Sequence, residues 1–450
     1  MTSPMTPGSA PGGGSGPTYR VPERVPVTTG RYLVVFGADV GGDETAMADT
    51  LRSVTGASSI LSASDFGGGR IDTAQARGAE ATMLPALGLA VVSVDPSRAT
   101  TMRGLAAGDG RIVAVEPELI HHVLGPRPAA DGLSAEYLRG YRDAVAHLYE
   151  LATAGAVAEG PLFADTDELT WGLQATAAAG SPFTGAGIRL AVLDTGLTLG
   201  HPDLDGRTVV AESFIDGETA EDGHGHGTHC VGTAAGSTSP PRAPEVPRYG
   251  VAPDVEIYAG KVLSNEGSGD DTGILSGINW ALENGCAVIS MSLGADVETV
   301  STAYETVGRR ALAAGSLIVA AAGNNARRAD GDPGFVGIPA NSPSIMAVAA
   351  VDPNLVIADF SARSNPVEGG QIDIAGPGVD VFSSWTLPDR YTTISGTSMA
   401  TPHVAGIAAL WSEATGLTGE ALWARLTEAA IRLEEPSVDV GAGLVRAPVE

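Results

Sequence analysis

Three of the eight histidines in this 450-residue chain stand within six positions, in the stretch EDGHGHGTHC at residues 221–230. Histidine titrates near neutral pH and is also the commonest metal ligand, so His224, His226 and His229 suit either proton transfer or metal binding. A zinc site would need a further protein ligand, and the sequence offers no second His/Cys cluster to supply one. The choice therefore depends on which other reactive residues the fold brings to this stretch.

Two other motifs supply the partners that a proton-transferring histidine needs. AVLDTG places Asp194 just after an apolar, strand-like run, and SGTSMATPHVAGIAAL (395–410) places Ser398 in the first turn of a long apolar helix. A serine hydroxyl is a weak nucleophile that requires a base, and the base requires an orienting anion. The order Asp, His, Ser is one of the orders in which such a triad occurs. Each motif alone is common, since a strand-end Asp is often a helix cap and GTS is a frequent turn.

Five motifs in a fixed order make the sequence resemble the subtilisin-like serine peptidases. They are LDTGLTLGHPDL, DGHGHGTHCVGT, ISMSLG, AAAGNN and GTSMATPHVAG, and the resemblance covers about residues 168–447. HGTHC and IDIAGPG look closest to the proteinase K branch. The resemblance implies that Asp194 orients, His226 is the base and Ser398 the nucleophile. It also implies that Asn324 and the backbone N–H of Ser398 donate to the oxyanion. A side-chain donor of this kind contributes roughly 3–4 kcal/mol to transition-state stability in a subtilisin.

The resemblance also assigns the substrate cleft, in which P1 is the residue whose carbonyl is attacked and P2 to P4 precede it. One wall is a strand edge that pairs with the substrate backbone, and the opposite wall is a glycine-rich segment. Gly337 forms the floor of the S1 pocket, where glycine leaves room for a large apolar P1 side chain, and His224 lines the cleft. The wall residues are Ser292, Leu293 and Gly294 on one side, and Gly267, Ser268 and Gly269 on the other.

Acidic residues flank Ser268 on the second wall, namely Glu266, Asp270 and Asp271. A water-poor cleft strengthens charge interactions, so we expect Arg or Lys to be favoured at P2 or P4. The alternative is that these acids form only a solvated loop on an acidic protein.

Calcium is the cofactor that the resemblance implies. Asp373, with the backbone carbonyls of Pro343 and Ile345, matches the calcium site of the proteinase K branch, although Asp373 could instead only cap a turn. Asp203 matches one ligand of a second family site. The loop at 236–250, which would supply the other ligands of that second site, is longer here and rich in proline.

Composition limits the partners. The net charge of −27 repels nucleic acid and anionic membranes, and there is no apolar run of 18 residues that could span a bilayer. Cys230 and Cys286 are too few for a disulfide framework and are expected to be free thiols. The first 20 residues lack the pattern of a Sec signal peptide, which predicts a cytoplasmic protein, or one exported by another route or already trimmed of its signal.

The elements that must position these residues fall into four segments. Residues 1–29 are predicted to be a disordered Pro/Gly/Ser-rich tail, and 30–120 a small α+β unit of β-α-β-β-α-β order that resembles the family's inhibitory propeptide. Residues 121–167 are a linker with an amphipathic helix at 133–155. Residues 168–450 alternate buried strands with helices, which predicts an α/β domain with a parallel sheet covered on both faces.

The sequence therefore predicts a self-processing serine endopeptidase that prefers large apolar P1 residues and acts as a monomer. Its partners are peptide or protein substrates and its own N-terminal unit. A catalytically silent binding protein on the same fold is disfavoured by the complete triad, and a transpeptidase that hands the acyl group to an amine stays open.

Overall fold

The computed structural model describes residues 26–449 apart from 107, 109, 125–160, 239–245 and 366–368. The helix expected over 133–155 and most of the expected N-terminal tail lie outside the described residues. None of the helices in the described ranges has the length and apolar character needed to cross a bilayer.

The first part of the chain, residues 28–123, is called here the N-terminal unit. Its elements are β1 (Thr28–Phe36), α1 (Glu44–Thr55), β2 (Ile60–Ser62), α2 (Thr73–Gly78), β3 (Ala81–Leu84), β4 (Leu89–Val92), α3 (Pro96–Ala106) and β5 (Ile112–Val123). Helix α1 has a cap at each end, because the Asp43 side chain accepts from Ala46 N and Gly56 closes the helix at φ 74°. Helix α2 and strand β3 were not predicted from the sequence, since neither has a long periodic pattern.

The sheet of the N-terminal unit runs in the order β5-β1-β4-β3-β2, with β2 and β3 parallel and the other neighbours antiparallel. Alternate residues of a strand point to opposite faces. Val34 and Val92 lie in a core with Met47 of α1 and Met102 of α3, whereas Leu33 belongs to a cluster that continues into the second unit. Helices α1 and α3 thus cover one face of the sheet, and the other face is buried against the second unit.

The second unit, residues 161–449, is built on a seven-stranded sheet in the order β14-β13-β12-β10-β6-β8-β7, in which every pairing is parallel. These strands are β6 (Arg189–Asp194), β7 (Val209–Ser213), β8 (Glu256–Lys261), β10 (Val288–Met291), β12 (Leu317–Ala321), β13 (Met346–Val351) and β14 (Ile374–Pro377). The shorter strands are β9 (Ser268–Asp270), β11 (Leu293–Gly294), β15 (Val381–Ser384) and β16 (Tyr391–Ile394).

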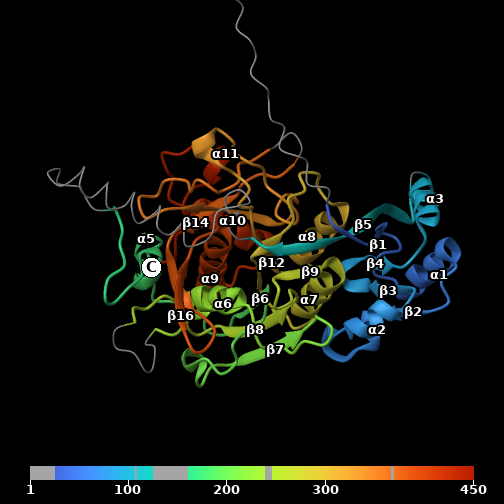
Figure 1. Ribbon diagram of the computed structural model, residues 1–450, viewed down its shortest axis with the longest axis horizontal. Coiled ribbons are helices and arrows are strands. Elements are labelled where there is room, and N and C mark those ends of the chain that lie inside the picture. Colours follow the sequence, from blue (N-terminus) through green and yellow to red (C-terminus); the bar gives the residue numbers. More distant parts are fainter. Residues whose placement is uncertain are drawn as a thin grey trace, which may run out of the picture.

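Helices cover both faces of this sheet, as Figure 1 shows. They are α5 (Trp171–Ala175), α6 (His226–Ala235), α7 (Asp271–Glu283), α8 (Thr302–Ala313), α9 (Thr397–Thr415), α10 (Gly419–Ala429) and α11 (Ser437–Val440). Along β6, Leu190 and Val192 share a core with α6 and α9, while Ala191 and Leu193 share the other core with α7 and α8. The predicted three-layer α/β fold of this part of the chain is confirmed.

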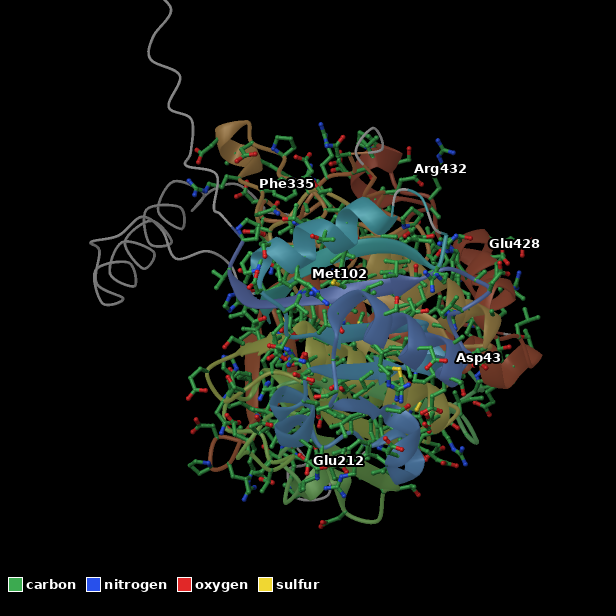
Figure 2. All side chains as sticks on the ribbon, turned by 90° about the vertical axis from the view of Figure 1, so that its right-hand side faces the viewer. Asp43, Met102, Glu212, Phe335, Glu428 and Arg432 are labelled. Atoms are coloured by element: carbon green, nitrogen blue, oxygen red, sulfur yellow. The ribbon has the colours of Figure 1, made fainter. Side chains whose placement is uncertain are left out.

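Strand β5 joins the two units. It pairs with β1 in the N-terminal unit, and its last residues pair with β9 and β11 of the second unit. Seen from the side on which the N-terminal unit lies, this unit covers part of the second unit (Figure 2). Its Leu33, Val35 and Val91 lie in one buried cluster with Ile274 of α7 and Tyr304 of α8. Since each buried aliphatic side chain contributes roughly 1.5–3 kcal/mol, this contact is a substantial apolar interface.

Candidate active site

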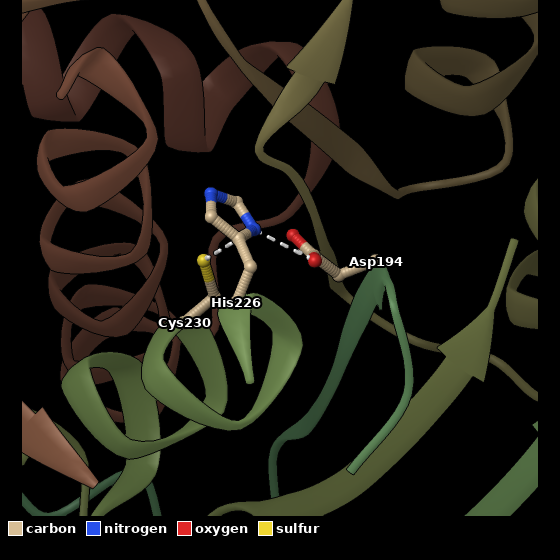
Figure 3. A group of neighbouring side chains, drawn as sticks. All are labelled: Asp194, His226 and Cys230. Carbon is tan, nitrogen blue, oxygen red and sulfur yellow. Dashed lines mark hydrogen bonds and ion pairs between the residues drawn. The ribbon is translucent and has the colours of Figure 1, made fainter. Parts of the chain in front are cut away.

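Asp194 and His226 meet at the carboxyl end of the parallel sheet. Asp194 is the last residue of β6, and His226 is the first residue of α6. His226 Nδ1 lies 2.8 Å from Asp194 Oδ1, and both side chains are buried (Figure 3). Burial by itself would lower the pKa of His226, but the Asp194 carboxylate outweighs it and raises this pKa well above 6.5. The pair can therefore hold a proton that a neighbouring group releases.

Asp222 shapes the turn that presents His226, and it was not singled out from the sequence. Its Oδ1 accepts hydrogen bonds from the backbone N–H groups of His224 and Gly225, and its Oδ2 accepts from Thr228 N. Gly225, at φ 105°, leaves no room for a Cβ, which would lie 2.4 Å from the Trp385 ring. The signal that could have identified Asp222 is an aspartate just before a glycine-rich helix start, a common capping arrangement.

Two neighbours of His226 in the same helix, His229 and Cys230, have different surroundings. His229 is fully buried, its Nε2 lies 3.0 Å from the Val381 carbonyl, and burial lowers its pKa to about 3. Cys230 lies one turn after His226, with its Sγ 3.8 Å from His226 Nδ1, and burial raises the pKa of its thiol above 9.0. Cys230 and Cys286 are both free, as predicted.

Within the described residues, Asp194, His226 and Cys230 also form the one group whose ligand atoms are close enough to hold a metal ion. The geometry favours proton transfer instead. The Asp194 carboxylate and His226 Nδ1 are bonded to each other, and Cys230 is a protonated thiol rather than the thiolate that binds metals.

Ser398 and Asn324 converge on a carbonyl group supplied by the chain itself. Ser398 lies in the first turn of α9, and Asn324 follows β12. The carbonyl oxygen of Leu124 accepts from Asn324 Nδ2 at 2.6 Å and from Ser398 Oγ at 3.0 Å. Asn324 Oδ1 accepts from Thr397 N at 2.9 Å, which fixes the orientation of the amide. Donation by the Ser398 backbone N–H to the oxyanion stays a prediction, because the oxyanion forms only during the reaction.

Residues 120–124, called here the tail, lie as a strand between the two predicted cleft walls. On one side His122 is opposite Ser268 and His121 is opposite Gly269, and Val123 N donates to Gly267 O at 2.9 Å. On the other side Leu293 is opposite Val123 and Gly294 is opposite His122. Both walls thus pair with one extended segment.

The remaining predicted cleft residues lie near the tail. A Cβ on Gly294 would lie 3.4 Å from Leu124 Cδ1, so the Leu124 side chain runs along this residue. A Cβ on Gly267 would lie 3.1 Å from both His224 Nε2 and Val123 Cγ2, which places His224 beside the residue before Leu124. Ser292 O is 3.2 Å from Ser398 Oγ.

Gly337 is required for a close backbone approach. Its Cβ would lie 2.4 Å from Ala295 O, directly after the Ser292–Gly294 wall. This contact explains why a glycine occupies the position.

The two candidate calcium ligands have different surroundings. Asp373 is half-buried, its Oδ2 accepts from Ala347 N at 2.8 Å, and burial raises its pKa to about 7. No basic side chain pairs with Asp373 within the described part of the chain. Asp203 is buried and accepts from the hydroxyl groups of Tyr249 and Tyr391. Two tyrosines therefore satisfy Asp203 without a cation, and only Asp373 remains suited to one.

The sequence profile of the subtilase family matches residues 185–444 of this chain. The chain is 40% identical over 265 residues to subtilisin DY of Bacillus licheniformis, a match that covers 58% of this chain and 90% of that protein. It is 43% identical over 265 residues to a thermostable alkaline protease of Halalkalibacterium halodurans, covering 58% of this chain and 67% of the protease. It is 42% identical over 241 residues to subtilisin E of Bacillus subtilis, covering 53% of this chain and 58% of that protein.

Proposed function

The chain belongs to the subtilase family, and we propose that this subtilisin-like serine endopeptidase is made as a zymogen that cuts itself after Leu124. The observation that carries the proposal is the position of the Leu124 carbonyl oxygen, within hydrogen-bond distance of Asn324 Nδ2 and Ser398 Oγ. The tail occupies the cleft as a substrate would, with Leu124 as P1 and His121 as P4. Self-cleavage is therefore proposed at the single peptide bond between Leu124 and Gly125.

The roles follow from the geometry. Ser398 Oγ attacks the Leu124 carbonyl carbon and passes its proton to His226 Nε2, which has no hydrogen-bond partner among the described residues. Asp194 stabilises the imidazolium that forms, and Asn324 donates to the oxyanion. His226 then protonates the amine of Gly125, which leaves, and water hydrolyses the Leu124 ester to a carboxylate. In the first half-reaction the bond to Ser398 Oγ replaces the peptide bond to Gly125. In the second, the bond to the water oxygen replaces the bond to Ser398 Oγ, and His226 takes a proton from the water and returns one to Ser398.

Contacts of the N-terminal unit support its role as an inhibitor that stays bound. Glu116 accepts from Thr302 N at 2.7 Å and caps α8, and Glu118 accepts from Thr272 N at 3.0 Å and caps α7. A carboxylate at a helix N-terminus is favoured both by the free N–H groups and by the helix dipole. These two caps place β5, and with it the tail, in the cleft.

The P1 preference follows from the same segment. Leucine occupies the P1 position in the tail, and glycine at 294 lets its side chain lie against the wall. We therefore propose that large apolar P1 residues are preferred in other substrates, with Gly337 keeping the pocket roomy.

Calcium binding at Asp373 is a further part of the proposal. A carboxylate with one backbone donor and no basic partner is suited to a hard cation, and the carbonyls of Pro343 and Ile345 would complete the ligand set. The cation would stabilise the fold and take no part in the reaction.

The test is the fate of the Ser398→Ala chain. We expect it to stay full length, whereas the wild-type chain yields a product that begins at Gly125, as read by mass spectrometry of intact protein. Fluorophosphonate should label Ser398 in the wild-type chain only. If the pure Ser398→Ala chain is cut at the same place and rate, self-processing is wrong. Product masses in the presence of an added amine separate hydrolysis from acyl transfer.

A further inference from the structure

A second buried aspartate–histidine pair lies in the cleft, away from the catalytic one. His121 Nε2 is 2.6 Å from Asp271 Oδ1, and the two side chains are 0% and 1% exposed. Tyr304 OH donates to the same Oδ1 at 2.6 Å, and its ring packs edge-on against the imidazole with the ring centroids 5.7 Å apart. The Asp271 carboxylate thus accepts hydrogen bonds from a histidine and a tyrosine at a buried position in the peptide-binding cleft.

One residue of this pair, His121, lies in the tail, and the other, Asp271, lies in the second unit. His121 stands opposite Gly269 in the strand pairing and is the third residue before Leu124, so its side chain occupies the P4 place. Asp271 is the first residue of α7, and Tyr304 lies on α8. When the tail leaves, another substrate brings its own P4 side chain to the same two residues.

The other acids of this wall do not contact the P4 side chain of the tail. Asp270 Oδ1 accepts from Gly273 N at 3.0 Å, and its Oδ2 lies 2.9 Å from Arg77 of the N-terminal unit, whereas Glu266 is exposed to solvent. Among the described residues, His121 is the only potentially cationic side chain within salt-bridge distance of Asp271. Of the three acids, Asp271 is therefore the one that pairs with a P4 side chain.

An apolar P4 side chain would leave Asp271 Oδ1 with Tyr304 as its one side-chain donor. A buried acceptor that loses a partner destabilises the complex, while a second donor restores the bond. Asp271 is the first residue of α7, so its carboxylate lies at the positive end of the helix dipole.

We infer that the S4 subsite of this peptidase selects side chains that donate a hydrogen bond to Asp271, with histidine first and lysine or arginine next, over apolar ones. Asp271 is the specificity-determining residue and Tyr304 positions its carboxylate. The inference rests on the proposed function, because it takes the tail as a substrate mimic.

The experiment uses the self-processed enzyme and a set of peptides with leucine at P1, valine at P2 and histidine, lysine, glutamine, alanine, leucine or phenylalanine at P4. For the wild type we expect kcat/KM to be about tenfold higher for P4 histidine than for P4 leucine. In Asp271→Leu the order should reverse, and in Tyr304→Phe the ratio should fall without reversing. Equal rates for histidine and leucine in the wild type, or the same order in Asp271→Leu, would overturn the inference.

The matched control is Glu266→Gln, which removes one charge from the same wall and leaves Asp271 in place. The preference for P4 histidine should survive in this variant and at high salt, whereas a general attraction of cationic peptides fades as salt rises. An equal loss in Glu266→Gln would assign the effect to net charge and contradict the inference. If Asp271→Leu does not fold, the wild-type peptide series alone still decides.

Failure of the proposed function gives a different result. In that case no product that begins at Gly125 forms, and the tail cannot be taken as a substrate mimic. Cleavage of every peptide without a P4 ranking defeats only the S4 inference. The His121→Leu/Asp271→Leu double variant gives a second measure, since its self-cleavage should be faster than that of either single variant.

Discussion

The molecule contains two buried aspartate–histidine pairs with nearly the same geometry and different surroundings. Asp194 and His226 are joined at 2.8 Å within the second unit, and Asp271 and His121 are joined at 2.6 Å between the second unit and the tail. Cys230 links the first imidazole to the serine at the start of α9, because Cys230 Sγ lies 3.8 Å from His226 Nδ1 and 3.6 Å from Ser398 O. The second imidazole packs against Tyr304. An Asp–His bond therefore does not identify a catalytic base, and the neighbour of the imidazole decides between reaction and recognition.

The largest expected difference between the two pairs is in the rate of peptide hydrolysis. Asp194→Asn should lower kcat by about 10⁴-fold, because the amide no longer holds the reactive tautomer of His226; the magnitude is that of another serine peptidase. Asp271→Asn should leave hydrolysis of a peptide with alanine at P4 within about threefold of wild type. Steady-state kinetics on the two purified variants check this. Comparable losses in both variants would remove the distinction between the pairs.

The pH dependence of self-cleavage should follow the first pair. Asp194 raises the pKa of His226 well above 6.5, and the base must be neutral to accept the Ser398 proton. The rate should therefore rise with pH, about tenfold per unit below that pKa, and level off above it. The measurement is the rate of product formation after full-length chain refolded at pH 5 is moved to values between pH 5 and 9.

His121→Gln is the control for this profile, because glutamine keeps a donor for Asp271 and cannot titrate. The midpoint of the profile should be unchanged in this variant. A midpoint that moves would show that the second pair, through docking of the tail, controls the rate.

Much of this site could be predicted from the sequence, and the two pairs show why part of it could not. Asp194, His226, Ser398 and Asn324 lie in motifs at strand ends and helix starts, where local sequence determines their position. Asp271 is one of three acids that the sequence places on the cleft wall, but His121 lies 150 residues away from it and in no recognisable motif. Their contact depends on the register in which β5 pairs with β9, and strand register is a tertiary property that no local pattern states.

The same reasoning applies to the fold. The buried apolar strands of residues 168–450 predicted the parallel sheet correctly, and β6, β8 and β12 are continuous apolar strands of this kind. Strand β7 (VVAES) is short and only partly buried and was missed, as was β3, which is only four residues long. Strand β1 extends back to Thr28, because Thr28 is paired with Leu119.

Release of the tail depends on how firmly the N-terminal unit is held, and Arg310 is expected to contribute. Its guanidinium donates to the carbonyl oxygens of Gly41 at 2.7 Å and of Pro85 and Ala86 at 3.3 Å. Hydrogen bonds from a charged donor are stronger than neutral ones, so Arg310→Ala should speed release of the cleaved unit by about tenfold or more. Size-exclusion chromatography of the cleaved complex over time checks this.

Arg309→Ala is the matched control, since Arg309 is exposed and, among the described residues, pairs only with Glu305 within its own helix. An equal acceleration in Arg309→Ala would contradict a specific role for Arg310.

A third carboxylate, Asp373, differs from Asp194 and Asp271 because no histidine pairs with it among the described residues. Burial raises its pKa from 3.8 to about 7, so between pH 4 and 7 the folded chain holds a proton that the unfolded chain has lost. Without calcium, stability should fall as pH rises through this window and change no further above it. Calcium at pH 8 should restore stability, by about 2.7 kcal/mol at a hundredfold excess over Kd. Melting temperatures in the Ser398→Ala background, with Ca²⁺ or chelator, measure both effects.

Asp373→Asn should abolish the calcium effect, while Asp203→Asn should keep it, because two tyrosines already satisfy Asp203. A calcium effect of equal size in Asp373→Asn would remove Asp373 from the site, and the metal would then have to bind elsewhere.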